Sequence, residues 1–370
     1  MSTEVDQKIE RLLNLMIDES LDAIILATRR NLSWITGGGE FFVNMASERG
    51  IAIAVITKEE RLIFTSNNEA PRLLDEENIE KYGFTLRSID WYLGSPLEMA
   101  LKYIKDKGLK RIGSDIELAY ENVRLIEEKL TNLRINLTKY EIERYRAIGK
   151  ECANILRRVC YEIRRGITEQ EISGMLHSEF YSRGIRLPVV LIAADDRAFK
   201  YRHPIPKGKK LNKYAIISIV AEKYGLHVAL TRSVSIGKPS EEVIRKHNSV
   251  SRIMAIMMMN TRPGVKSGEI IRKAIEAYKN EGYPNEWKLH HQGGWIGYMP
   301  REKKVLPDTE DRIGKWQALA WNPTISGVKS EDTIIVEEKD IVNITEDPKW
   351  PTLEIEVNGK IVRRPEILLI

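Results

Sequence analysis

The pattern of apolar residues changes near residues 133–139, and this change divides the chain in two. Before it, short apolar runs at 21–27, 49–57 and 61–66 alternate with stretches of helical spacing, which is typical of a mixed sheet covered by helices. After it, an apolar stripe recurs every three or four residues, as in a long amphipathic helix. The 370 residues are also enough to bury two separate cores. We therefore expect two domains, 1–136 and 137–370.

Each half has its own set of expected elements. Thr168 and Glu171 have the spacing of a capping box, which predicts the start of a helix. Two apolar runs separated by Lys-Tyr-Gly predict a β-hairpin over Ile216–Gly237. The remaining elements are expected at these positions: helices at 5–16, 69–74, 97–107, 241–259 and 267–280, and strands around 318–321, 333–336 and 340–344.

The hairpin belongs to a series of motifs that resembles a known family. HHQGGWIGYMPRE at 290–302, AWNPTISG at 320–327 and KSEDTIIV at 329–336 follow it in the order of the metal-bearing segments of prolidases, aminopeptidases P and creatinases. LDAIILATRRNLSWITG at 21–37 resembles the amino-terminal domain of the same family. The resemblance implies an α/β (α+β) fold. A creatinase-type three-layer α/β domain would precede a pita-bread catalytic domain with a curved, mostly antiparallel sheet.

The resemblance also shows which metal ligands have been replaced. The two Asp positions hold Ser218 and Ala229, the ligand His position holds Gly294, and one Glu position holds Asn322. Only Glu331 is retained of the five former metal-ligand positions. Two adjacent divalent ions carry four positive charges and need anionic oxygen ligands, which one carboxylate cannot supply. We therefore expect that the protein binds no metal.

Three residues are the candidates for catalysis. His203 matches a His that contacts substrate in prolidases and transfers protons in creatinase, and an imidazole titrates near neutrality. Arg301 stands at the family's second His position, where its guanidinium suits a carboxylate or a developing oxyanion. Three roles are open for Glu331: holding His203, binding a substrate amino or guanidino group, or pairing with Arg301.

Further residues near these positions are candidates for substrate binding. They are His290, His291, Gln292, Trp295, Glu302, Asn322 and Arg232. Gly293 and Gly294 permit a close backbone approach, and four tryptophans in this part of the chain are compatible with an aromatic pocket wall. Core packing is the alternative role for each tryptophan. For Arg232, the alternative is an ion pair that braces the hairpin.

Three functions are compatible with these residues. The first is metal-independent hydrolysis of a C–N bond in a small polar amide or guanidino-type substrate. It is favoured because the residues at the altered positions are mostly polar. The second is an Xaa-Pro dipeptidase or aminopeptidase with one divalent ion, held by His203, Glu331 and either His290 or His291. The third is a protein that binds a ligand or peptide without catalysis.

Composition excludes several other classes of protein. The net charge of +5 is small and spread along the chain, so no nucleic-acid partner is expected. The longest apolar run, residues 253–259, is far shorter than the roughly 20 residues that cross a membrane. Cys152 and Cys160 fit one buried helix face. We expect a cytoplasmic protein that acts on a small molecule or short peptide, and the family resemblance implies a homodimer.

Overall fold

The computed structural model describes residues 3–370, which form two compact units. The first unit ends at Arg134 and the second comprises Ile135–Ile370. Across the described residues, no helix is both long enough and apolar enough to cross a bilayer.

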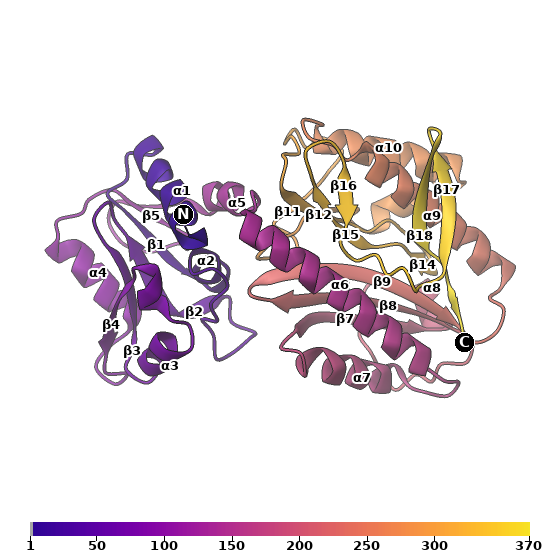
Figure 1. The fold of residues 1–370 in the computed structure, drawn as a ribbon, viewed down its shortest axis with the longest axis horizontal. Helices are drawn as coiled ribbons and strands as arrows, with labels where there is room; N and C mark the ends of the chain where they lie inside the picture. Colours follow the sequence, from indigo (N-terminus) through magenta and orange to yellow (C-terminus); the bar gives the residue numbers. More distant parts are fainter. Residues whose placement is uncertain (1–2) are drawn as a thin grey trace. The chain divides into compact units, whose positions relative to one another are not determined.

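The first unit is built on a six-stranded mixed sheet with the strand order β4-β3-β2-β1-β5-β6 (Figure 1). β1 pairs antiparallel with β2 and parallel with β5, so the expected mixed sheet is confirmed. Its elements are α1 Glu4–Asp18, β1 Ala23–Thr28, α2 Arg29–Ile35, β2 Arg49–Ile56, β3 Arg61–Ser66, α3 Ala70–Asp75, η1 Ile79–Tyr82, β4 Thr85–Ile89, α4 Pro96–Asp106, β5 Ile112–Ser114, β6 Val123–Leu125 and α5 Glu127–Arg134.

Helices cover both faces of this sheet. Ile25, Val55 and Phe64 share one core with the buried side of α4. Ile24 and Ala54 are the chain neighbours of Ile25 and Val55, so they point to the opposite face, and they are fully buried too. α1 and α2 pack against β1. The unit therefore has the three layers that the sequence predicts.

The second unit contains two larger sheets, which are mostly antiparallel. One has the order β11-β10-β12-β15-β16 and the other β19-β9-β8-β7, with β19 parallel to β9 (Figure 1). The strands are β7 Arg186–Ala194, β8 Tyr214–Lys223, β9 Leu226–Ser235, β10 Gly293–Trp295, β11 Lys303–Lys304, β12 Gln317–Trp321, β13 Thr324–Ile325, β14 Val328–Lys329, β15 Asp332–Val336, β16 Ile341–Asn343, β17 Thr352–Val357, β18 Lys360–Pro365 and β19 Leu368–Leu369. An isolated bridge between Thr231 and Glu331 links the two sheets.

Long helices bury the apolar sides of these sheets. The helices of the unit are α6 Lys139–Glu162, α7 Glu169–Tyr181, α8 Asp196–Lys200, α9 Glu241–Asn260, α10 Ser267–Asn280 and the 3-10 helix η2 Glu286–Leu289. The predicted capping box of α7 is present, since Glu171 N donates to the Thr168 hydroxyl and Thr168 N donates to the Glu171 carboxylate. α9 and α10 pack on β12 and β15 around one large core.

Most of the expected elements of this unit are confirmed, but several strands were missed, among them β7 and those of two hairpins, β13–β14 and β17–β18. β8 and β9 form the predicted hairpin in full register, and α9 and α10 begin where expected. The second of these hairpins pairs β17 with β18 through Asn358 and Gly359, which both have positive φ. Asn-Gly between alternating apolar residues is a strong signal for such a turn, so the sequence did contain the information.

Gly149 provides a test of the packing of α6. A Cβ atom at this position would lie 2.4 Å from the Ile344 carbonyl oxygen, so an added methyl group must push the two segments apart. We expect Gly149→Ala to lower the free energy of unfolding by about 1–3 kcal/mol, measured by urea denaturation. Gly174 in α7 is the matched control, because a Cβ there meets nothing within 4 Å. Gly174→Ala should raise stability by about 0.5–1 kcal/mol. Equal effects of the two substitutions would contradict this packing.

Candidate active site

Glu331 lies at the centre of the candidate active site, where the two sheets of the second unit meet. Its backbone carbonyl accepts from Thr231 N at 3.1 Å, and its side chain is 4% exposed. The Thr231 hydroxyl donates to Glu331 Oε2 at 2.7 Å, and the Thr231 and Ser218 hydroxyls lie 2.7 Å apart. These bonds fix the carboxylate against the β8–β9 hairpin.

Two cations neutralise the Glu331 carboxylate. Lys329 Nζ lies 2.7 Å from Oε2, and an Arg301 nitrogen lies 3.0 Å from Oε1. Burial by itself would raise the pKa of Glu331. The charges of Lys329 and Arg301, with hydrogen bonds from Lys329 and Thr231, outweigh burial and lower the pKa to about 2. Of the three roles open for Glu331, the structure therefore shows the pairing with Arg301.

Three histidines lie together beside this carboxylate. His203 Nε2 and His290 Nε2 are 3.2 Å apart, and the rings of His290 and His291 stack with centroids 4.4 Å apart. Burial and the charge of Lys329 lower the pKa of His203. Burial is also the main cause that lowers the pKa of His290 to about 4 and that of His291 to about 3. The cluster is therefore uncharged at neutral pH.

Three buried polar atoms of this region have no hydrogen-bond partner among the described residues. They are Arg301 Nε, His291 Nδ1 and Asn322 Oδ1. A buried polar atom without a partner is unfavourable, and such atoms are uncommon in folded proteins. Arg301 Nε is a donor, whereas Asn322 Oδ1 is an acceptor. The region therefore contains both an unsatisfied donor and an unsatisfied acceptor.

The side chains at the former metal-ligand positions do not fit two metal ions. Ala229 has no donor atom, and its backbone is bonded to the Thr333 hydroxyl. At Gly294 a Cβ would lie 2.0 Å from the Lys303 carbonyl oxygen, so no larger residue fits this backbone. Within residues 3–370, no three His, Cys, Asp or Glu side chains are arranged to hold a metal ion. The residues present therefore do not match the dimetal centre implied by the resemblance.

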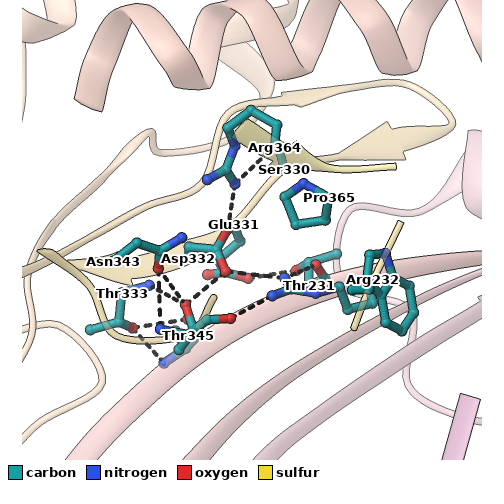
Figure 2. A network of polar contacts seen from close by, with 12 residues as sticks. Thr231, Arg232, Ser330, Glu331, Asp332, Thr333, Asn343, Thr345, Arg364 and Pro365 are labelled. Carbon is teal, nitrogen blue, oxygen red and sulfur yellow. Dashed lines mark hydrogen bonds and ion pairs between the residues drawn. The ribbon is translucent and has the colours of Figure 1, made fainter. Parts of the chain in front are cut away.

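Next to Glu331, Asp332 anchors a second network that is structural (Figure 2). Arg232 lies 3.1 Å from its Oδ1, Arg364 pairs with Oδ2, and the Thr345 hydroxyl donates to Oδ1 at 2.7 Å. Arg232 also donates to the Thr345 carbonyl at 2.7 Å. All four side chains are buried. Arg232 therefore braces the hairpin, and its prediction as a substrate-binding residue is not supported.

Three other predicted binding residues use their polar atoms within the protein. Trp295 is 1% exposed and its Nε1 donates to Gln317, so it is a core residue rather than a pocket wall. The Gln292 amide is bonded to the Tyr278 hydroxyl and to two backbone carbonyls. Glu302 accepts from Tyr298 N at 2.8 Å. These polar atoms therefore already have hydrogen-bond partners within the protein.

Sequence reasoning missed Lys329, which supplies a direct ion pair to Glu331. The two residues are two apart, and in an extended segment such residues point to the same face. A basic residue at this spacing from the retained acid was therefore the available signal. The ammonium group of Lys329 would be repelled by a metal ion bound at Glu331. This signal is therefore informative only together with the replaced ligand positions.

Comparison with known proteins gives the same assignment as the fold and motifs. The model of metallopeptidase family M24 matches residues 143–338, and that of the creatinase/prolidase N-terminal domain matches residues 8–148. The chain belongs to the M24 family of creatinases, prolidases and aminopeptidases P. An Xaa-Pro dipeptidase of Pyrococcus horikoshii is 22% identical over 358 residues, covering 90% of this chain and 95% of that protein.

Solved structures confirm the predicted fold. An Xaa-Pro dipeptidase from Bacillus anthracis superimposes with a TM-score of 0.78 at 17% identity, covering 99% of this chain and 100% of that one. The N-terminal domain of the FACT complex subunit SPT16 from chickpea superimposes with a TM-score of 0.72 at 12% identity, covering 93% and 96%. The three-layer amino-terminal domain and the pita-bread domain are thus shown.

The ion pairs of Glu331 predict a pH-dependent stability. Because its folded pKa is about 2 and its usual value is 4.5, the carboxylate stabilises the fold above pH 4.5, and this stabilisation is lost as the pH falls towards 2. The difference corresponds to an effect on the order of 3 kcal/mol. We expect Glu331→Gln to lose about this much at pH 7 and somewhat less than half of it at pH 3, measured by urea denaturation. Exposed Glu276 provides the control variant, Glu276→Gln. A loss that is the same at both pH values would contradict the assignment.

Proposed function

We propose that the protein is a prolidase-like hydrolase that cleaves a C–N bond in a small carboxylate-bearing amide or short peptide without a metal centre. The observation that carries this proposal is the neutral His203–His290 pair beside the cations Lys329 and Arg301. Two cations and one carboxylate leave one positive charge in excess. A substrate carboxylate suits this excess better than a cationic guanidino group.

The hydrogen bonds determine which nitrogen of His203 is free to act as a base. His290 Nδ1 lies 2.6 Å from the His291 carbonyl oxygen, and because a carbonyl only accepts, Nδ1 carries the hydrogen. In neutral His290 the Nε2 atom is then an acceptor. His203 must donate its Nε2 hydrogen across the 3.2 Å contact, which leaves Nδ1 of His203 unprotonated.

This arrangement supports a simple hydrolytic step. Nδ1 of His203 takes a proton from water while the water oxygen bonds to the carbonyl carbon of the substrate. The C–N bond then breaks, and the same proton passes from His203 to the leaving nitrogen. Arg301 Nε, which has no partner among the described residues, is the donor for the negative charge that develops on the carbonyl oxygen. Asn322 Oδ1 accepts from a substrate N–H.

The deciding experiment combines metal content with turnover. Protein produced with manganese, cobalt and zinc is dialysed without chelator, and its metal is measured by mass spectrometry. Hydrolysis of N-acyl amino acids and Xaa-Pro dipeptides is then assayed with and without EDTA. We expect no stoichiometric metal, turnover that EDTA does not affect, and a loss of at least about 100-fold in kcat for His203→Ala. Unchanged turnover in His203→Ala would refute the mechanism.

Two other functions have specific support and would give other results. The names of the relatives favour an Xaa-Pro peptidase, for which bound metal and EDTA-sensitive turnover are expected. The third function is binding of a peptide or ligand without turnover, and the fold shared with a FACT complex subunit is compatible with it. In that case the same substrates would bind and stay intact.

The tautomer of His203 is directly measurable by long-range proton–nitrogen NMR on histidine-labelled protein. We expect the Nε2–H form in the wild type at pH 7, because His290 accepts that hydrogen. His290→Ala removes the acceptor, so His203 should become a mixture of both tautomers. Signals of the exposed His177 are the internal control and should not change. A wild-type His203 in the Nδ1–H form would contradict the proposed base.

A further inference from the structure

A cavity separate from the candidate active site lies at the start of α9. Its volume is about 830 Å³, and it is bounded by α9, the segment at 349–351 and the C-terminal residues 366–369. None of its lining residues belongs to the cluster around Glu331. This volume falls in the range of small-molecule sites, roughly 300–1,000 Å³.

The walls of the cavity are mainly apolar. Ile244, Trp350, Ile367 and Leu368 contribute to them. Trp350 is held in place by its Nε1, which donates to the Glu366 carbonyl at 2.9 Å, and the guanidinium carbon of Arg232 lies 5.7 Å from its ring centroid. The aromatic wall is therefore rigid and borders the Arg232–Asp332 network. Such a wall favours an apolar ligand body.

The lining also carries an excess of positive charge. Lys238 and Lys349 are exposed, and neither ammonium group has a carboxylate partner among the described residues. Glu366 is the acidic residue of the lining. Two ammonium groups against one carboxylate favour an anionic ligand group.

A buried polar side chain completes the lining. His247 is 5% exposed, its Nε2 donates to the Pro365 carbonyl at 3.0 Å, and its Nδ1 has no partner among the described residues. Burial lowers the pKa of His247 to about 4, so the ring is neutral and adds no charge. The anion must therefore be held by the two lysines.

We propose that this cavity binds an apolar monocarboxylate, with its hydrocarbon part against Trp350 and Ile244 and its carboxylate between Lys238 and Lys349. The proposal concerns a site other than the candidate active site and does not depend on the hydrolytic function. The ligand class follows from the combination of an apolar wall with unpaired ammonium groups.

The test is calorimetric titration of the full chain with decanoate and, separately, with decan-1-ol. We expect saturable binding of one decanoate per chain and at least tenfold weaker binding of decanol, because the alcohol lacks the charge. The double variant Lys238→Gln/Lys349→Gln should weaken decanoate binding at least tenfold without affecting decanol. Lys102→Gln changes an exposed lysine of the first unit and should have no effect.

A second variant tests the apolar wall. Ile244 is half-buried on α9, so Ile244→Trp should fill the cavity and weaken the binding of both decanoate and decanol. An unchanged thermal unfolding midpoint of this variant would show that the chain still folds. Equal affinities of wild type for decanoate and decanol would overturn the proposal. So would decanoate binding that is unchanged in the double lysine variant, or an absence of decanoate binding.

Discussion

The second unit depends on one buried carboxylate, that of Asp332, which is held by Arg232 and Arg364. The three side chains come from β9, β15 and β18, so their ion pairs tie together segments that are far apart in the sequence. Removing one partner of such a buried pair costs about 3–5 kcal/mol because an uncompensated charge remains. The network also fixes the neighbouring residues Thr231 and Glu331. The geometry of the candidate active site therefore follows from a framework of ion pairs and hydrogen bonds made within the protein.

This framework uses none of the five former metal-ligand positions, so the fold does not depend on the residues that stand there. Lys329 and Arg301 now provide the positive charge beside Glu331. Both cations are side chains of this protein that donate hydrogen bonds. The charge and the acceptor oxygens of Glu331 are therefore satisfied within the protein. This explains how a buried carboxylate is retained when four other ligand positions hold Ser218, Ala229, Gly294 and Asn322.

The sequence predicted those features that depend on local pattern or on a motif. The β8–β9 hairpin, the capping box at Thr168 and the altered ligand positions are of this kind. It did not predict contacts that depend on tertiary structure. His203 and His290 are 87 residues apart and meet only in the folded chain. Trp295 was misassigned because a motif gives a residue's position in the chain but not its burial. The ion pair of Lys329 and the Asn358–Gly359 turn were also missed, although both have local signals: the spacing of Lys329 from Glu331 and the Asn-Gly dipeptide.

In the proposed hydrolysis, the cations at Glu331 also restrict how the attacking water is activated. A metal ion lowers the pKa of the water it binds, whereas an ammonium or guanidinium group that is already paired with a carboxylate has little effect of this kind. The proton of an attacking water must therefore go to a neutral base. Glu331 is a poor base, since its pKa is about 2 and its oxygens are occupied by Lys329, Arg301 and Thr231. His203 is neutral and has Nδ1 unprotonated, because His290 accepts the hydrogen on its other nitrogen. The ion pairs of Glu331 and the pairing of the two histidines thus both favour His203 as the base of the proposed reaction.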